Sequence, residues 1–229
     1  MTHMIARNVL VPAALSLTVV GCGGGDGADL TTFQDSSSYA IGMNMGGQLA
    51  RTGVELDVAA FMQGFRDVVD ERETAIGDSA VGMILQQLSR QLDEENQRRE
   101  EATLQEGEQY RETNAKRSGV QTTASGLQYE VLEEGSGPKP EATARVQVHY
   151  RGTLIDGTEF DSSYDGDPVS FNLNGVIPGW TEGVQLMSVG SKYRLVLPPA
   201  LAYGPRGAPP DIPPNATLIF EVELLSIEN

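Results

Sequence analysis

The sequence predicts an α+β protein, in which a C-terminal antiparallel sheet curls around a short helix. Apolar residues alternate in the C-terminal half, as at Val146, Val148 and Tyr150, which is typical of half-buried strands. The N-terminal half instead has apolar residues at helical spacing, among them Phe61 and Phe65. A long polar stretch separates the two patterns. We therefore expect an all-α N-terminal domain, a long linking helix and then the sheet domain.

Composition and charge narrow the classes of function. The chain has 229 residues, which favours one or two domains. Its formal net charge of −16 argues against nucleic-acid binding, because phosphate neutralisation needs clustered Lys and Arg side chains. One Cys and two His exclude an intrachain disulfide framework and argue against a metal site built from these residue types. We expect neither a cofactor nor a bound metal.

Residues 1–21 have the pattern of a signal peptide. Arg7 supplies the positive start, and the apolar run after it is too short to span a bilayer comfortably. The run ends in Val-Val-Gly-Cys22, which resembles the bacterial lipoprotein box, where the Cys is lipidated and becomes the first mature residue. An ordinary signal peptide with a chance Cys is the alternative. Residues 22–31 would form a flexible tether, and the lipid would be the only membrane anchor of a periplasmic, outer-membrane lipoprotein.

Residues 32–77 are predicted to form a small helical domain. Apolar residues share one side of a first helix within Ser36–Arg51. Asp57 is the expected N-cap of a second helix, whose apolar stripe includes Phe61 and Phe65. These stripes either form an intrachain core or pair with a second copy of the chain. Two short helices make a thin core, which favours a homodimer through this domain.

A long connecting helix is predicted over residues 78–118, with Asp78 as its cap. Its first turns have an apolar face, whereas the sequence after Leu92 is polar nearly all round and predicts a solvent-exposed spacer between domains. Gly107 is the expected soft point of this helix. The segment Val120–Gly126 is then predicted to be a linker.

Residues 120–229 are predicted to form the compact sheet domain. Strands are expected at Leu127–Val131, Arg145–Thr153, around Phe160, Lys192–Leu197 and Thr217–Leu225, and a short helix at Gly179–Met187. The stretch Val146–Trp180 combines the only Trp with other aromatic residues between turn signals, which indicates a concave apolar site. The Pro-rich residues 200–215 are expected to form a loop over this site.

Several long motifs of this domain resemble the FKBP-type peptidyl-prolyl cis-trans isomerases. They are VHYRGTLIDGTEFDSS, GVIPGWTEGVQLM, and LAYGPRG followed by IPPNATLIFEVELL. The earlier YAIGMNMGGQL and LDVAAFMQGFRDVV are similar to the N-terminal dimerisation domain of the macrophage infectivity potentiator and related periplasmic members. The resemblance implies prolyl isomerase activity on proline-containing unfolded or exported polypeptides, and binding of macrolide inhibitors.

The resemblance also implies the roles of individual residues. Asp161 would be the polar catalytic group near the twisting carbonyl, and Tyr203 would donate its hydroxyl to a ligand carbonyl. Trp180 would form the pocket floor, and Ile177 would offer its backbone N–H to the ligand. The rest of the substrate-binding pocket would be Tyr150, Phe160, Val176, Ile212 and Phe220. For Tyr150 and Phe220, plain core packing is the alternative.

The chain departs from the family pattern at three places. The segment between Asp161 and Pro168 is shorter than in the small eukaryotic members. Val169 stands where an aromatic residue is frequent, and Ala208 and Asp211 replace a His and an apolar residue. These differences bear on macrolide affinity and on sequence preference.

Two functions from different classes fit the sequence. An isomerase would accelerate the slow rotation of the X-Pro bond by enclosing the proline in a dry apolar pocket. The alternative is a catalysis-independent chaperone, in which paired domains on long arms clamp unfolded clients. A surface protein that acts on host tissue is a third hypothesis.

Overall fold

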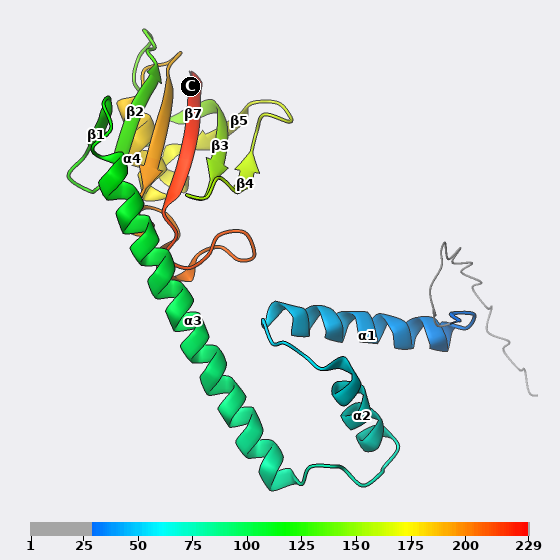
Figure 1. Cartoon of the computed structure of the whole chain (residues 1–229). Helices are drawn as coiled ribbons and strands as arrows, with labels where there is room; N and C mark the ends of the chain where they lie inside the picture. The colour runs from blue at the N-terminus through cyan, green and yellow to red at the C-terminus, as the bar shows by residue number, and fades with distance from the viewer. Residues whose placement is uncertain (1–28, 229) are drawn as a thin grey trace, which may run out of the picture. The chain divides into compact units, whose positions relative to one another are not determined.

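The computed structural model describes residues 29–228. The predicted signal peptide, Cys22 and most of the predicted tether lie outside the described residues. The chain divides into two compact units, Met1–Thr74 and Ala75–Asn229. The second unit contains both the long helix and the sheet (Figure 1).

The N-terminal unit contains the helices α1 (Phe33–Arg51) and α2 (Val58–Val69). The first helix begins earlier than predicted, because Thr32 and Asp35 cap it reciprocally. The Asp35 N–H donates to Thr32 Oγ1 at 3.1 Å, and the Thr32 N–H donates to Asp35 Oδ2 at 2.9 Å. The predicted N-cap of α2 is confirmed, since Asp57 Oδ1 accepts hydrogen bonds from the first backbone N–H groups of that helix.

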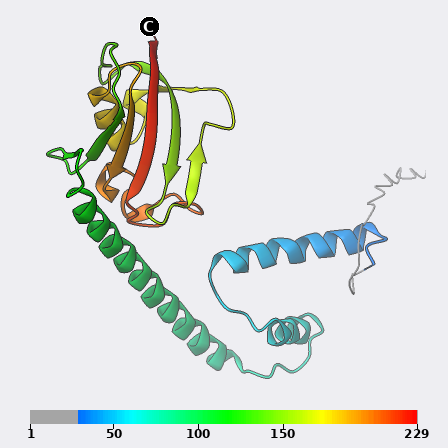
Figure 2. The ribbon, with the colours of Figure 1, turned by 45° about the horizontal axis from the view of Figure 1, so that its top comes forward.

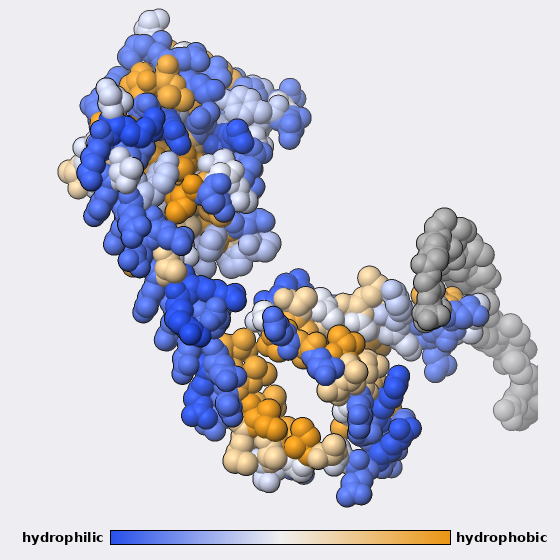
Figure 3. Space-filling view, viewed as in Figure 1, coloured by the Kyte–Doolittle hydropathy of each residue, from blue (hydrophilic) through white to orange (hydrophobic). Residues whose placement is uncertain are grey.

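An apolar groove of about 670 Å³ lies between α1 and α2. Phe61 and Phe65 line it together with Gly42 and Gly46, and neither helix contains a buried residue in the described chain. A Cβ added to either glycine would meet no atom within 4 Å. Figure 3 shows apolar side chains exposed over these helices. The two helices therefore do not close a core by themselves.

The long helix α3 (Asp78–Asn114) has 37 residues, which corresponds to about 55 Å at the usual rise per residue. Gly77 is its N-cap, so the prediction for Asp78 is wrong by one position. Asp78 is the first helical residue, where a negative charge favours the helix dipole. Apolar side chains on the first turns, such as Ile84 and Leu85, are exposed. Within residues 29–228, no helix combines the length and apolar character needed to cross a membrane.

A seven-stranded antiparallel sheet follows α3 (Figures 1 and 2). Its strands are β1 (Val120–Thr122), β2 (Gln128–Glu133), β3 (Arg145–Thr153), β4 (Glu159–Ser162), β5 (Val169–Asn172), β6 (Lys192–Leu197) and β7 (Leu218–Glu228). The order is β1-β2-β6-β7-β3-β4, and β5 pairs with β3. The last strand of the sequence therefore lies between two central partners, β6 and β3.

The helix α4 (Pro178–Leu186) packs against one face of this curled sheet (Figure 1). Its predicted position is confirmed to within a residue. Trp180, Val184 and Met187 are buried on one side, in the same core as Leu195 of β6. Gly183 lets the helix approach, because a Cβ there would lie 2.6 Å from Leu195 Cδ1. The predicted α+β class and the sheet closed by one helix are thus confirmed.

The last turns of α3 pack against the sheet, so the prediction of a solvent-exposed spacer is wrong there. Asn114 is buried, and its Nδ2 donates to Gln128 Oε1 at 2.8 Å. Gln128 Nε2 in turn donates to the Arg111 carbonyl at 2.9 Å. These polar groups can be buried because they satisfy one another. The predicted linker is also wrong in its first part, since Val120–Thr122 pair with β2.

Candidate active site

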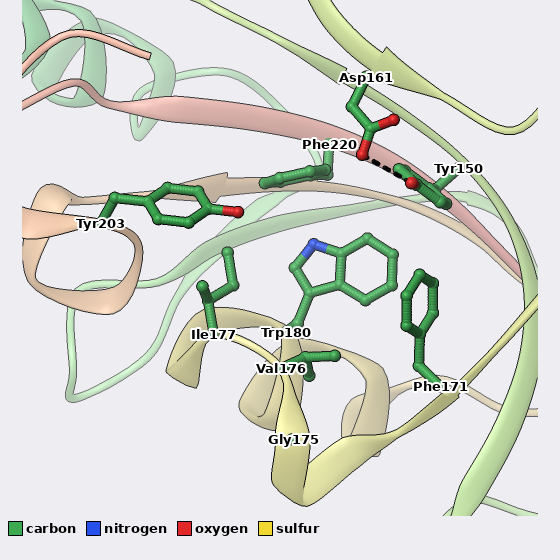
Figure 4. Close-up of a pocket in the computed structure, with 9 residues that line it drawn as sticks. All are labelled: Tyr150, Asp161, Phe171, Gly175, Val176, Ile177, Trp180, Tyr203 and Phe220. Carbon is green, nitrogen blue, oxygen red and sulfur yellow. Dashed lines mark hydrogen bonds between the residues drawn. The ribbon is translucent and has the colours of Figure 1, made fainter. Parts of the chain in front are cut away.

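A cavity of about 520 Å³ lies between α4 and the sheet, with Trp180 at its floor (Figure 4). Trp180 is the third residue of α4, in the first turn after the N-cap residue Ile177. Three aromatic rings meet the indole edge-on. The ring centroids lie 5.2 Å away for Tyr150, 5.6 Å for Phe171 and 5.4 Å for Phe220. Edge-to-face contacts of this kind fix the orientation of the indole.

The cavity is lined by nine residues from several strands and loops: Tyr150, Asp161, Phe171, Gly175, Val176, Ile177, Trp180, Tyr203 and Phe220. Most are apolar or aromatic, and the polar exceptions are one carboxylate and the tyrosine hydroxyls. This composition suits a small apolar ligand that is oriented by a few polar groups. No cluster of His, Cys, Asp or Glu side chains that could hold a metal occurs in the part of the chain that the structure describes.

Tyr150 orients the carboxylate of Asp161. The pairing of β3 with β4 brings the two side chains together, and the Tyr150 hydroxyl donates to Asp161 Oδ2 at 2.7 Å. Burial raises the pKa of the Tyr150 hydroxyl, and the hydrogen bond to Asp161 raises it further. The hydroxyl therefore stays protonated at neutral pH, and its proton points to the carboxylate rather than to a ligand.

Tyr203 supplies a polar group on another side of the cavity. It lies in the loop between β6 and β7, between the short 3₁₀ helices η2 (Pro199–Leu201) and η3 (Gly204–Arg206). Its side chain is 42% exposed, and its hydroxyl points over the cavity (Figure 4). A hydroxyl in this position can donate to a carbonyl of a bound peptide. The predicted loop over the site is therefore present.

Seven of the nine pocket residues predicted from the sequence line the cavity: Tyr150, Asp161, Val176, Ile177, Trp180, Tyr203 and Phe220. Phe160 and Ile212 do not line it. The ring of Phe160 instead packs edge-on against Phe220, with centroids 5.6 Å apart. Ile212 is buried and exchanges backbone hydrogen bonds with Ala208 within the loop. Both residues therefore pack against elements that form the cavity wall. The predicted lipidation site, Cys22, lies outside the described residues.

Sequence reasoning missed Phe171 and Gly175, which also line the cavity. Phe171 belongs to β5 and is paired with Val146 of β3. The available signal was that Val169 and Phe171 stand two residues apart, as residues on one face of a strand do. A four-residue strand, however, offers too few positions to establish a face. Gly175 ends the 3₁₀ helix η1 (Leu173–Gly175) just before α4, and its missing side chain keeps the cavity open there.

A curled antiparallel sheet, closed by one helix and enclosing an aromatic cavity, has the shape and lining of a binding domain for a small apolar group. Residues 137–225 match the family model described as FKBP-type peptidyl-prolyl cis-trans isomerase. Residues 34–131 match a second model, described as the domain amino terminal to FKBP-type peptidyl-prolyl isomerase. The chain belongs to the FKBP-type peptidyl-prolyl cis-trans isomerase family.

Individual relatives cover most of the chain. It is 47% identical to the FKBP-type isomerase FkpA of Aeromonas hydrophila over 88% of this chain and 79% of that protein. It is 46% identical to the FKBP-type 22 kDa isomerase of Escherichia coli, over 86% and 96% of the two chains. Outer membrane protein MIP of Legionella longbeachae is 35% identical over 89% of each. The crystal structure of Escherichia coli FkpA has a TM-score of 0.65 at 39% identity and covers 86% of this chain and 97% of that one. The protein is accordingly a peptidyl-prolyl cis-trans isomerase.

Proposed function

We propose that the cavity above Trp180 grips the proline ring of a client polypeptide and lowers the barrier to rotation of the preceding peptide bond. That barrier is about 18–20 kcal/mol, because rotation breaks amide resonance. The twisted amide is less polar than the planar one, so a dry apolar pocket binds it more tightly and speeds the reaction. The observation that carries this proposal is the set of three aromatic rings held edge-on around the indole.

Polar groups would act on the bound peptide from two sides. Tyr203 would donate its hydroxyl to a peptide carbonyl. The backbone N–H of Ile177 would donate likewise, since N–H groups at the start of a helix have no intrahelical partner. Asp161 would lie near the twisting carbonyl, with its carboxylate oriented by the hydrogen bond from Tyr150.

A protease-coupled isomerisation assay on a proline peptide tests the role of Tyr203. We expect Tyr203→Phe to lower kcat/KM about tenfold, which corresponds to the loss of one hydrogen bond of about 1.4 kcal/mol. Tyr164→Phe is the matched control, because Tyr164 of the same domain is also 42% exposed and lies outside the cavity. Equal rates for the two variants would contradict the proposed role.

We further propose that the clients are exported polypeptides and that the protein works in the periplasm, anchored to the outer membrane through Cys22. Support comes from the signal-like residues 1–21 and the Cys that follows them. The name of the Legionella relative, Outer membrane protein MIP, is in keeping with this location. In a bacterial host, Cys22→Ser should release the protein from the membrane fraction and abolish incorporation of labelled palmitate. Membrane retention without the label would count against the anchor.

We also propose that residues 32–77 form a homodimer interface. Support comes from the groove between α1 and α2, which exposes Phe65 and leaves open space at Gly42 and Gly46 for a helix to approach. Phe65→Ser should shift the protein toward monomer in sedimentation equilibrium. Val68→Ser is the control, because Val68 is exposed on the same helix outside the groove. Identical association of both variants would rule out the groove as the interface.

A second candidate function is the catalysis-independent chaperone. It is favoured by the apolar surface that α1 and α2 expose and by the length of α3, on which two catalytic domains of a dimer could be held apart. Deletion of residues 30–74 should abolish suppression of client aggregation and leave peptide isomerisation intact. The deletion stops before α3, because the last turns of α3 pack on the sheet. Loss of both activities together would argue against separate functions.

Macrolide inhibitors are proposed ligands of the same cavity. Trp180 is the only Trp of the chain and lies at the cavity floor, so its fluorescence reports on an occupant directly. Titration with a macrolide should change the indole emission and inhibit the assay over the same concentration range. Inhibition without an emission change would place the macrolide elsewhere.

A further inference from the structure

The end of α3 touches the root of the loop that carries Tyr203. Thr217 is the last residue before β7, and its side chain is 2% exposed. Arg111 Nη1 donates a hydrogen bond to Thr217 Oγ1. A Cβ added to Gly107, one turn earlier on the helix, would lie 2.5 Å from the same oxygen. Only glycine at this position lets the helix approach Thr217 so closely.

The loop between Gly204 and Asn215 is closed on itself, so displacement of one end is passed to the other. The Asn215 N–H donates to the Gly204 carbonyl at 3.0 Å. Within the loop, Ala208 and Ile212 exchange two backbone hydrogen bonds of 2.8 and 3.0 Å. Tyr203 immediately precedes the first residue of this closed loop. A short connected path therefore joins the Thr217 backbone to the tyrosine over the cavity.

The helix end is itself anchored to the sheet. The buried amide of Gln128 on β2 bonds both the Arg111 carbonyl and the side chain of Asn114. On the adjacent strand, Arg194 Nη2 donates to the Tyr110 hydroxyl at 3.2 Å. Separation of the helix from the sheet would break the hydrogen bonds of both buried amides and expose the packed surface between helix and sheet to water, which is unfavourable. The last turns of α3 therefore act as a fixed support rather than as a loose arm.

We propose that Gly107 and Arg111 are positioning residues for catalysis: through Thr217 they hold the loop that sets Tyr203 over the proline pocket. This inference rests on the proposed role of Tyr203. It gives the end of the long helix a part in the reaction, although no residue of that helix lines the cavity. The catalytic unit would therefore begin before Gly107, and not at residue 120 as the sequence pattern predicts.

The sharpest variant is Gly107→Ala in the full chain. Alanine favours a helix over glycine, so a purely local effect would stabilise α3. Contact with Thr217 predicts instead a fall in kcat/KM of about tenfold, because small displacements of a positioned group cost rate steeply. Gly82→Ala is the matched control: it lies in the same helix, and a Cβ there would meet no atom within 4 Å. Arg111→Gln removes the hydrogen bond to Thr217 without adding volume, and it carries the same prediction if Gly107→Ala fails to fold.

A double-mutant cycle with Tyr203→Phe separates positioning from general damage. In the Tyr203→Phe background, Gly107→Ala should lower kcat/KM less than about twofold, since the hydroxyl that it displaces is already absent. The same tenfold loss in both backgrounds, or no loss in either, overturns the inference. If Tyr203→Phe alone keeps full activity, both the proposed role of Tyr203 and this inference are contradicted. If Tyr203→Phe is impaired while Gly107→Ala is not, only the positioning role is overturned.

Discussion

The ring of Phe160 lies directly against the backbone of Gly152. A Cβ added to Gly152 would be 2.6 Å from both Cε2 and Cζ of that ring, and 2.9 Å from Cε1 of Phe220. Gly152 belongs to β3, and its pairing with β4 places Phe160 beside it. The absence of a side chain near the end of β3 therefore leaves room for two rings that meet edge-on, one of which lines the cavity.

Gly152→Ala should lower both stability and activity. Overpacking of a close-packed site costs about 1–3 kcal/mol, and the displaced Phe220 ring would narrow the cavity. Denaturant unfolding and the peptide assay check this prediction. Gly166→Ala is the control, because a Cβ in that loop would meet nothing within 4 Å. A Gly152→Ala protein as stable and active as the control would show that Phe160 relaxes freely.

Tyr150 and Asp161 should behave as one unit in catalysis. Tyr150→Phe removes the donor of their hydrogen bond and Asp161→Ala removes its acceptor, and we expect each to lower kcat/KM about tenfold. The kcat/KM of the double variant should be little below that of the less active single variant, because the effects of substitutions at residues in direct contact are not additive. Tyr129→Phe serves as control, since its hydroxyl bonds to Gln121 outside the cavity. Fully additive losses would mean that the two groups act separately.

The cap of α2 should stabilise the N-terminal unit without affecting peptide turnover. Asp57 Oδ1 accepts from the N–H groups of Ala59 and Ala60 at 2.9 and 3.1 Å. Asp57→Ala should therefore cost about 1 kcal/mol, seen as faster hydrogen exchange in α2. Asp57→Ser keeps a capping oxygen and should restore protection. If both variants exchange alike, the cap does not limit opening of this helix.

The end of β7 should show a pH-dependent stabilisation. Glu228 accepts from Ser170 at 2.7 Å and from Arg145 at 2.6 Å, and these hydrogen bonds hold its pKa below the usual range. A lowered pKa means that the unfolded chain binds more protons in acid. The stabilisation is therefore present above about pH 4.3, the unfolded value, and is lost as the pH falls through the folded pKa.

Glu228→Gln is the variant that tests this dependence. It should melt about a degree or two below the wild type at pH 7, and the difference should vanish toward pH 3. Arg145→Gln removes the other partner of the same ion pair and should converge in the same way. A difference in melting temperature that is constant with pH would contradict the assignment.

Local patterns were sufficient for much of the fold. Alternation predicted β3, and a strand at β6 and the short helix α4 were expected close to their observed bounds. These elements are long enough, and apolar enough on one face, for periodicity to show. The site residues in long motifs were likewise recognisable, and seven of them meet at one cavity.

The remaining features depend on contacts between distant and mostly polar residues. Gly107 was expected to be a soft point, yet it is buried against Thr217, which lies far along the chain. Asn114 and Gln128 look like surface residues in the sequence, and their burial is favourable only because hydrogen bonds to each other and to the Arg111 carbonyl satisfy them. Phe171 belongs to the cavity because β5 pairs with β3, a long-range contact that no short window of sequence contains.

The catalytic domain cannot be completed before β7 has been synthesised. In chain order this strand of 11 residues follows the other six strands, yet β3 and β6 both pair with it, and Phe220 of the cavity lies on it. A chain emerging from its N-terminus can form its helices early, whereas the centre of its sheet stays open until β7 arrives. A chain that stops before β7 therefore lacks Phe220 and the strand that joins β3 to β6, so its cavity is incomplete.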